Sequence, residues 1–469
     1  MQVSRRSTLS LFTSAALGPG ESHASLPNIG FKGPTNERRT ECGIGALMPW
    51  ADALWVITYT AHEDPGPFDG AGLHRIDDTF RAERLNLHRN GANANRFVHS
   101  ISNQCIIGPY IIDMQGNWKY LKAFDGHRLT GTMQHLTDPA NRVYLITMGG
   151  LFFEMDINTL EVRLISDICK LFNITSKPHF KGGAMAQGRV VVTNNGFYEF
   201  GDKDGGLFEY DGKQWRRLSG KPHMDAFSYT NFGNVLFATG WDESSSLFHA
   251  LVKGQWQTYR LPKASHAYNN GIQTEWMRIR EIETEHLMVD LMGMFYELQP
   301  IAFEGRIWGV NPVCSHIRII PDYCPFRGLL ALGGNQGTPI KFRGEDHNVL
   351  GGQPQSGIWF CVSDDMWKWG KPRGWGGPWR NSNVKAGVPS DPFLFTGFEH
   401  KVLHVASDRP GNVDIEIDFL GNGSWRRYER LTIGSDGYRQ HVFPTGFSAH
   451  WVRLVPDVST RMSAEFMFT

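Results

Sequence analysis

The stretch DGHRLTGTMQHLTDPANRVYLIT, residues 125–147, decides the fold class, because it reads as one strand, a turn and a second strand. Its middle, DPAN (138–141), has the composition of a turn and separates two segments that carry apolar side chains. His127 and Arg128 stand at the beginning of the first strand. The stretch therefore predicts a short antiparallel hairpin with polar groups at one strand start.

A short apolar segment, often ending near an acidic residue, recurs along the chain, and most copies follow another apolar strand. The copies are GLHRID (72–77), YIID (110–113), LFFEMD (151–156), LFEYD (207–211), LFHALV (247–252), MFYEL (294–298) and GIWFCVSD (357–364). Strand-like segments before and after them suggest four short strands per repeat, with a loose period of about 40 residues. This pattern is typical of β-propeller blades and predicts seven of them. An array of β-sandwiches is the competing architecture.

The C-terminal part of the chain has a different spacing. From residue 388 onward, alternating strands of ordinary sandwich length follow one another, such as NVDIEIDFL and SAEFMFT. The sequence therefore predicts an all-β protein with a propeller over residues 25–387 and a small β-sandwich-like module over residues 388–469. Helical periodicity is almost absent outside residues 167–173.

The N-terminus has the pattern of an export signal. SRRSTL (4–9) resembles a twin-arginine motif, a short apolar run follows it, and SHA (22–24) fits a cleavage site. We therefore expect residues 1–24 to be a signal and the protein to be periplasmic or secreted. A disordered tail is the other interpretation.

Charge and hydropathy narrow the classes of partner. The chain has 47 basic and 47 acidic side chains, so it presents no net positive field for nucleic acid or for a membrane surface. No apolar run reaches the length of a membrane-spanning helix. We expect a monomer.

Propellers gather the starts of their inner strands, and the loops after their second strands, around one mouth. Residues expected there, besides His127 and Arg128, are His62, Asn95, Arg96, Tyr110, His179, Lys181, Asn194, Asn195, Tyr198, His223, Asp225, Trp241, Glu275, Trp276, Asp290, His316 and Asn335. Tryptophan stacks on sugar rings, amide and imidazole groups bind hydroxyls, and cations bind carboxylates. The set suits an acidic saccharide, although each residue alone also fits a solvated or structural role.

The cysteines do not form a disulfide framework. None of the six lies in a C-x-x-C motif, and Cys42, Cys105 and Cys361 lie in apolar contexts expected of buried thiols. No cofactor is required by any motif. A structural zinc ion is an option at Cys314 and His316, with His347 in a later loop.

Four stretches resemble the propeller-fold α-L-rhamnosidases, which remove rhamnose that caps glucuronic acid on arabinogalactan such as gum arabic. The stretches are TNERRTECGIGALMPWADALWVITYTAH (35–62), GHRLTGTMQHLTDP (126–139), KPHFKGGAMAQGRVVVTNN (177–195) and WGKPRGWGGPWRNSNVKAGVPSDPFLFTGFEHK (369–401). The related propeller-fold ulvan lyases share the scaffold and cleave polymers of rhamnose and uronic acid. The resemblance covers nearly the whole mature chain.

The resemblance implies specific catalytic residues. His62 matches the single catalytic histidine of the rhamnosidases. The lyases use a tyrosine and a histidine with an arginine that neutralises the uronate; His127 fits the histidine. Met185 stands where the lyase tyrosine is expected, so Tyr198 or Tyr110 would have to replace it.

We therefore expect hydrolysis of terminal α-L-rhamnose linked to glucuronic acid in an acidic polysaccharide. One alternative is a lyase that cleaves rhamnose–uronic acid polymers by β-elimination. The other is a propeller that binds acidic glycans without chemistry.

Overall fold

The computed structural model describes the residues in the ranges 28–32, 42–60, 72–87, 93–176, 178–196, 205–229, 234–264, 277–300, 302–303, 306–307, 309–316, 318–336, 341–342, 345–346 and 355–469. The expected signal and several expected site residues, His62, Tyr198, Glu275, Trp276 and His347, lie outside them. The prediction of an all-β protein is confirmed, since strands make up nearly all of the regular structure.

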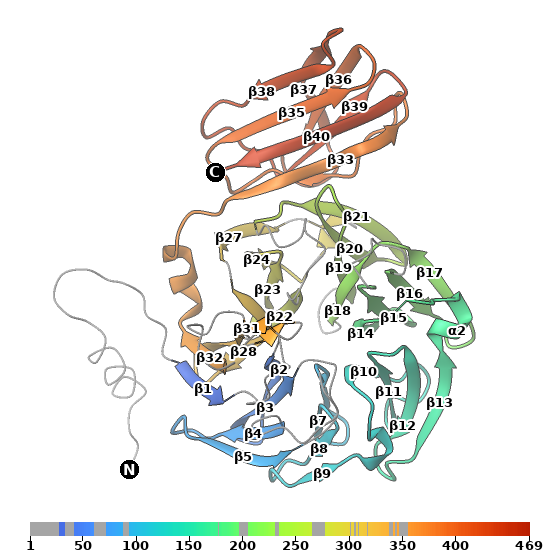
Figure 1. Cartoon of the computed structure of the whole chain (residues 1–469), viewed down its shortest axis with the longest axis vertical. Helices are drawn as coiled ribbons and strands as arrows, with labels where there is room; N and C mark the ends of the chain where they lie inside the picture. The colour runs from blue at the N-terminus through green and yellow to red at the C-terminus, as the bar shows by residue number, and fades with distance from the viewer. Residues whose placement is uncertain are drawn as a thin grey trace, which may run out of the picture.

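Most of the chain forms antiparallel meanders of four consecutive strands, which follow one another around a common centre in Figure 1. Three of these sheets stand alone and contain consecutive strands only. They are β6 (Arg96–His99), β7 (Gln104–Ile107), β8 (Tyr110–Ile112), β9 (Trp118–Tyr120); β10 (Leu129–Gln134), β11 (Arg142–Thr147), β12 (Leu151–Asp156), β13 (Val162–Asp167); and β14 (Phe180–Ala186), β15 (Arg189–Asn194), β16 (Gly206–Tyr210), β17 (Trp215–Ser219).

Two further meanders follow along the chain. The first is β18 (His223–Tyr229), β19 (Val235–Trp241), β20 (Ser246–Val252) and β21 (Gln255–Leu261). The second is β22 (Arg278–Glu283), β23 (His286–Leu291), β24 (Met294–Leu298) and β27 (Asn311–Ser315), with the short hairpin β25 (Ala302–Phe303) and β26 (Arg306–Ile307) inserted before its last strand.

An eight-stranded sheet joins the N-terminal strands to late ones. It contains β1 (Asn28–Lys32), β2 (Cys42–Trp50), β3 (Ala53–Thr60), β4 (Gly72–Ile76), β5 (Ala82–Leu87), β28 (Ile319–Phe326), β29 (Leu329–Gln336) and β32 (Gln355–Cys361); the hairpin β30 (Lys341–Phe342) and β31 (Glu345–Asp346) lies between the last two. A single residue pair, Gly43 with Asn335, links its two halves. Strand β1 pairs along its length with β32, so the chain's first described strand closes onto a late one.

The recurring apolar segments and the opening hairpin were read correctly from the sequence. Each of the seven segments overlaps a strand, in order β4, β8, β12, β16, β20, β24 and β32. The DPAN turn separates β10 from β11, and Asp138 O accepts hydrogen bonds from the main-chain N–H groups of Asn141 and Arg142. The one short α-helix, α2 (Ile168–Phe172), lies within the expected residues 167–173.

The C-terminal strands extend one sheet and form another. β34 (Phe393–Leu394), β36 (Gly411–Asp418), β37 (Trp425–Ile433) and β39 (Trp451–Pro456) continue the sheet of β18–β21 into a second eight-stranded sheet, which is joined by one parallel pair, Arg260 with Phe393. The separate sheet contains β33 (Gly374–Val384), β35 (Lys401–Ser407), β38 (Tyr438–Val442) and β40 (Thr460–Phe468). Because β33 pairs with β40, the C-terminal sheets begin before the expected boundary at residue 388. The sequence predicts a sandwich from strands in which apolar and polar residues alternate. The first strand of these sheets, β33, is rich in glycine and tryptophan and lacks this alternation.

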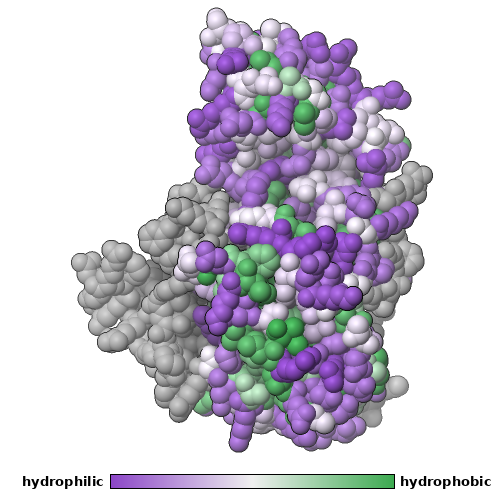
Figure 2. Space-filling view, turned by 90° about the vertical axis from the view of Figure 1, so that its right-hand side faces the viewer, coloured by the Kyte–Doolittle hydropathy of each residue, from purple (hydrophilic) through white to green (hydrophobic). Residues whose placement is uncertain are grey.

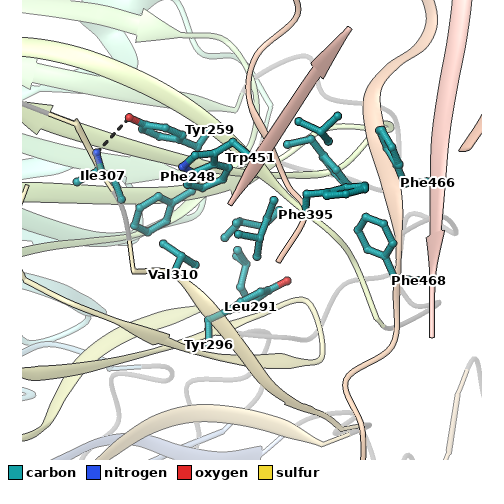
Figure 3. Close-up of a cluster of buried hydrophobic side chains, with 14 of the residues drawn as sticks. Phe248, Tyr259, Leu291, Tyr296, Ile307, Val310, Phe395, Trp451, Phe466 and Phe468 are labelled. Atoms are coloured by element: carbon teal, nitrogen blue, oxygen red, sulfur yellow. Dashed lines mark hydrogen bonds between the residues drawn. The ribbon is translucent and has the colours of Figure 1, made fainter. Parts of the chain in front are cut away.

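A shared apolar core joins the C-terminal sheets to the rest of the chain. Trp451 and Phe395 pack with Tyr259 and Phe248 of the β18–β21 meander, as Figure 3 shows, and the ring centroids of Tyr259 and Trp451 are 4.7 Å apart. The hydroxyl of Tyr259 accepts a hydrogen bond from the main-chain N–H of Ile307 at 3.2 Å. The junction is therefore a packed interior and not a flexible linker.

The face shown in Figure 2, which carries β13, α2 and β17, is largely polar but includes a group of apolar side chains. The large apolar side chains exposed on these elements are Leu164, Leu171 and Leu218. None of the helices in the described ranges has the length and apolar character needed to cross a membrane.

Candidate functional site

The starts of β10 and β14 lie side by side and bring His127, Arg128 and His179 to one edge of the sheets, which we name the start edge. Met148 links the two strands, because its N–H donates to Arg128 O at 2.8 Å and its carbonyl accepts from the N–H of Phe180 at 3.1 Å. His127 and His179 are half-buried. These two main-chain hydrogen bonds place the backbone of Arg128 and of Phe180 on either side of Met148; a shared role of His127, Arg128 and His179 stays a prediction.

Asn194 and Asn195, at the end of β15, support the start edge from beneath. The side-chain oxygen of Asn194 accepts from the N–H of His179 at 2.8 Å and from the N–H of Gly196 at 3.0 Å. His179 Nδ1 lies 3.1 Å from Gly196 O. Both asparagines are buried, so they position the backbone around His179 and do not offer their amides to a ligand on the surface.

Arg128 is the unusual member of the start edge. Its Nη1 is buried and has no hydrogen-bond partner, and no carboxylate pairs with it among the residues that the structure describes. Burial lowers the pKa of its guanidinium from the ordinary value. Arg128 as a whole is half-buried, but a buried N–H group of a guanidinium without a partner is costly, so Arg128 has the character of a site prepared for a carboxylate.

Trp241 does not provide the stacking surface expected for a sugar. It ends β19 and is 4% exposed, packed into the same apolar core as the C-terminal sheets. The sequence places it at a strand end, but the C-terminal sheets cover that end. Stacking of a sugar on its ring would require opening this core.

Asp290 and His316 bind each other rather than facing a shared mouth. His316 Nε2 lies 3.0 Å from Asp290 Oδ1, and the imidazole stacks on Phe295 with ring centroids 4.3 Å apart. Burial raises the pKa of the Asp290 carboxyl above its ordinary value. The pair is an internal polar contact of the β22–β27 meander.

The cysteines behave mainly as buried thiols. Cys105 and Cys361 are buried as expected, and burial raises the pKa of the Cys314 and Cys361 thiols to about 12. Within the described ranges, no three histidine, cysteine or acidic side chains gather in a way that could hold a metal ion. The suggested third zinc ligand, His347, lies outside those ranges.

A cavity of about 960 Å³, partly open to solvent, lies between the first strands of the sheets. Residues of β6, β10, β14, β18 and β22 line it, together with parts of β2, β28 and β29, and the lining includes Arg96, Lys181, Asp225 and Arg280. We call it the central cavity. Its lining does not include His127, Arg128 or His179. The residues expected in a single polar pocket therefore lie in two separate places, the start edge and the central cavity, and Arg96 and Lys181 line the central cavity.

A buried ion network stands in the wall of the central cavity. Arg280 binds two carboxylates, Asp322 Oδ1 at 2.7 Å and Asp225 Oδ2 at 2.9 Å. Arg96 Nη1 lies 3.4 Å from Asp322 Oδ2, and Arg278 Nη1 lies 3.6 Å from Asp225 Oδ1. Among the described residues, the network contains three guanidinium groups and two carboxylates.

Both carboxylates also accept hydrogen bonds from main-chain N–H groups. Asp322 Oδ2 accepts from the N–H of Leu47 at 2.7 Å, and Asp225 Oδ2 accepts from the N–H of Ile279 at 2.9 Å. Strands β2, β18, β22 and β28 are therefore tied together through two side chains. Asp322, Arg278 and Arg280 were not singled out from the sequence; the available signal is RIR (278–280), which places two arginines on one strand face.

The two places suit different chemistry. The start edge pairs imidazoles with a guanidinium that lacks an anion, which fits proton transfer next to a bound carboxylate. The central cavity has a rigid cationic wall, which fits binding. Neither depends on a metal-ligand group among the described residues.

Comparison with known proteins gives little. No family model matches the chain, and no curated protein matches it. Among solved structures, U3-55K aligns at 10% identity over 73% of this chain and all of its own, with a TM-score of 0.43. The extracellular domain of a one-component system from B. thetaiotaomicron aligns at 10% identity over 94% of this chain and 58% of its own, with a TM-score of 0.42.

PorZ of the type-IX secretion system of Porphyromonas gingivalis aligns at 9% identity over 68% of this chain and 40% of its own, with a TM-score of 0.37. At these TM-scores, the three likenesses carry no argument about what the chain does.

Proposed function

We propose that the chain is a seven-bladed β-propeller with a C-terminal β-sandwich-like module, and that it is a carbohydrate-active enzyme that acts on an acidic polysaccharide. The blade count is supported by dividing the two eight-stranded sheets where one residue pair links their halves, Gly43 with Asn335 and Arg260 with Phe393. That division leaves seven four-stranded meanders around the centre, the last closed by β1 (Figure 1). The module then begins at β33.

The proposed class of substrate, an acidic saccharide, rests on the environment of the Arg128 guanidinium. It is half-buried, its Nη1 is buried without a hydrogen-bond partner, no ionic partner pairs with it among the described residues, and it follows His127 in the chain at the start edge. Arginine binds a carboxylate through two parallel hydrogen bonds. A uronate unit would supply the missing charge and would place its sugar ring next to the imidazoles of His127 and His179.

The reaction that we propose is hydrolysis of terminal α-L-rhamnose linked to glucuronic acid, in a periplasmic or secreted monomer that needs no cofactor. It rests on the resemblance of the four sequence stretches to propeller-fold α-L-rhamnosidases, which assigns the catalytic role to His62. The uronate held by Arg128 would be the unit that follows the rhamnose. Incubation with gum arabic and with ulvan tests the proposal: free rhamnose supports it.

A lyase is the second candidate, and the adjacency of His127 and Arg128 favours it. β-Elimination needs a base for the proton next to the uronate carboxylate and a cation that stabilises the enolate-like intermediate. A product with ultraviolet absorbance from an unsaturated uronate would identify this reaction. If neither product forms but the glycan binds, the protein is a binding propeller.

Replacing His62 and His127 by alanine separates the two reactions. Removal of a general acid or base lowers the rate by at least about 10²-fold. If the protein is a hydrolase, we expect His62→Ala to release rhamnose more slowly by this factor. The lyase predicts the same loss of unsaturated product in His127→Ala. Unchanged turnover in both variants, with circular dichroism showing intact strands, would contradict both assignments.

Arg128→Gln tests uronate recognition directly. We expect kcat/KM on the acidic substrate to fall by roughly tenfold to a hundredfold, since a hydrogen-bonded charge contributes about 1.5–3 kcal/mol. Arg128→Lys should recover only part of the loss, because lysine keeps the charge without the planar fork. Arg81→Gln, at an exposed turn of the β4–β5 hairpin, is the matched control. Equal kinetics in Arg128→Gln and Arg81→Gln would refute the role.

A further inference from the structure

Trp367 exposes its indole ring on the surface. It lies in the short 3₁₀-helix η4 (Ser363–Lys368), which Figure 1 shows between β32 and β33. Its neighbour Met366 is buried and Trp369 packs against the same apolar core, so these two side chains turn inward while Trp367 is 52% exposed. It is the only exposed tryptophan among the residues that the structure describes. Tryptophan is highly buried on average, so this ring is a candidate contact for a ligand.

Trp367 lines an open pocket of about 430 Å³, which we name the tryptophan pocket. The pocket lies where β27 meets the C-terminal sheets. A Cβ atom added at Gly397 would collide with the Pro312 ring, so the loop between β34 and β35 lies directly against β27. Packed backbone therefore holds the pocket in place. The other lining residues are Asn311 and Val313 of β27, and Lys368, Gly370, Lys371 and Pro372 of η4 and the segment after it.

The two ammonium groups that line the tryptophan pocket both have carboxylate partners. Lys368 Nζ lies 2.8 Å from Asp365 Oδ1, and Lys371 Nζ pairs with Glu399. Both lysine side chains are 76% exposed, so water screens these pairs. The lysines can therefore offer hydrogen bonds to a ligand, but they do not select an anion.

Uncharged polar groups of the tryptophan pocket are available to a ligand. The side-chain amide of half-buried Asn311 and the indole N–H of Trp367 form no hydrogen bond with another residue in the described ranges. An amide can donate to and accept from hydroxyl groups, and an indole ring provides a flat apolar face for stacking. The rings of Pro312 and Pro372 add apolar surface beside it. A stacking face, an amide and paired charges together fit an uncharged sugar ring.

We propose that the tryptophan pocket binds an uncharged sugar unit of a polysaccharide, stacked on Trp367 and hydrogen-bonded by Asn311. The pocket is open to solvent, so the glycan chain can continue on both sides of the bound unit. The proposed function enters only in the choice of polymer, because the unit would belong to the polysaccharide whose uronate binds at Arg128. Two contacts with one chain raise the effective concentration of each binding unit, so this pocket would hold the polymer on the protein.

Retardation of the folded protein in native gels that contain gum arabic or ulvan tests the proposal without any turnover. Each polymer is also used after its carboxyl groups have been reduced to alcohols, which removes the uronate charge and keeps the sugar rings. We expect at least one polymer to retard the wild type in both its native and its carboxyl-reduced form. No retardation by any of these polymers would overturn the proposal, as would retardation by native forms only. Binding of a reduced form, with no product released from the native one, would contradict the proposed reaction and leave this pocket supported.

Substitutions locate the binding. Trp367→Ala should raise the dissociation constant for the carboxyl-reduced polymer roughly tenfold, since tryptophan is among the costliest residues to truncate at a binding site. Trp367→Phe, which keeps a smaller stacking face, and Asn311→Ala should lose less. Phe419→Ala, at a ring that is 67% exposed in the turn between β36 and β37, is the matched control and should bind as the wild type does.

Arg128→Gln, at the start edge, should also bind the carboxyl-reduced polymer as the wild type does. Wild-type affinity in Trp367→Ala, or an equal loss in Phe419→Ala, would contradict a sugar site in the tryptophan pocket. Loss of self-association in Trp367→Ala, measured by sedimentation and with polymer binding unchanged, would identify a protein interface and overturn the proposal.

Discussion

Asp322→Asn is expected to lower the free energy of unfolding by about 3–5 kcal/mol, although the side chain keeps its size. Breaking a buried ion pair from one side leaves the partner charge uncompensated, and that loss is typically of this magnitude. Asp322 is fully buried and holds Arg280 at 2.7 Å and Arg96 at 3.4 Å. The amide could still accept from Leu47, but it cannot balance the guanidinium groups. Urea unfolding at neutral pH measures the change.

A matched control and a double variant make this result specific. Asp78→Asn, in the exposed turn between β4 and β5, should leave the unfolding midpoint unchanged. Arg96→Met should cost less in the Asp322→Asn background than alone, because it then removes a charge that has lost its partner. Additive effects of the two changes, or a midpoint loss no larger than that of Asp78→Asn, would show that the network does not stabilise the fold.

The strand pattern could be predicted because it depends on local chemistry. The DPAN turn predicts the hairpin of β10 and β11, and the recurring apolar segments predict β4, β8, β12, β16, β20, β24 and β32. Neither signal depends on which strands lie next to these in space. The boundary at residue 388 was wrong because β33 contains GWGGPW and is recognisable only through its pairing with β40. Pairing partners distant in sequence leave no local signal.

The candidate site was predicted only in part, for a related reason. The start edge follows from strand starts, and His127, Arg128 and His179 lie there. The prediction that Trp241 offers its ring to a sugar was wrong, because Trp241 is buried in a core that it shares with the C-terminal sheets. Arg96 and Asp225 of the ion network were expected at strand starts, but Asp322, Arg278 and Arg280 were missed because charged residues usually lie in solvent. Only the packing of β2, β18, β22 and β28 brings these side chains together.

Buried neutral histidines make the fold sensitive to acid. His74, His223 and His450 each have a pKa lowered by burial to about 4, from the ordinary 6.5. His223 is fully buried, its Nδ1 lies 2.7 Å from Lys221 O, and its ring packs on the buried His249 with centroids 5.0 Å apart. Among the described residues, no carboxylate forms a hydrogen bond with either ring, so burial opposes protonation in the folded state.

The sign of the pH effect follows from proton uptake. Below pH 6.5 the unfolded chain protonates these imidazoles and the folded chain does not, so stability falls as the pH is lowered from 6.5 to about 4 and is unaffected by them above 6.5. Each such histidine lowers the free energy of unfolding by up to about 1.4 kcal/mol for each pH unit within this range. For His223 alone the loss reaches about 3 kcal/mol. Carboxylates whose pKa is lowered in the folded state, such as Glu154 and Glu209, add to the loss only at the acid end of this window, below about pH 5.

Urea unfolding between pH 7.5 and 4.5 measures this loss, and His223→Asn assigns its share. The asparagine amide can donate to Lys221 O in place of Nδ1, but it carries no titrating group. We therefore expect His223→Asn to be less stable than the wild type at pH 7.5 and to lose less stability on acidification. His400→Asn, at a side chain that is 56% exposed, should follow the wild-type curve. If the two variants lose stability in parallel as the pH falls, His223 is protonated within the folded protein and its burial does not oppose the charge.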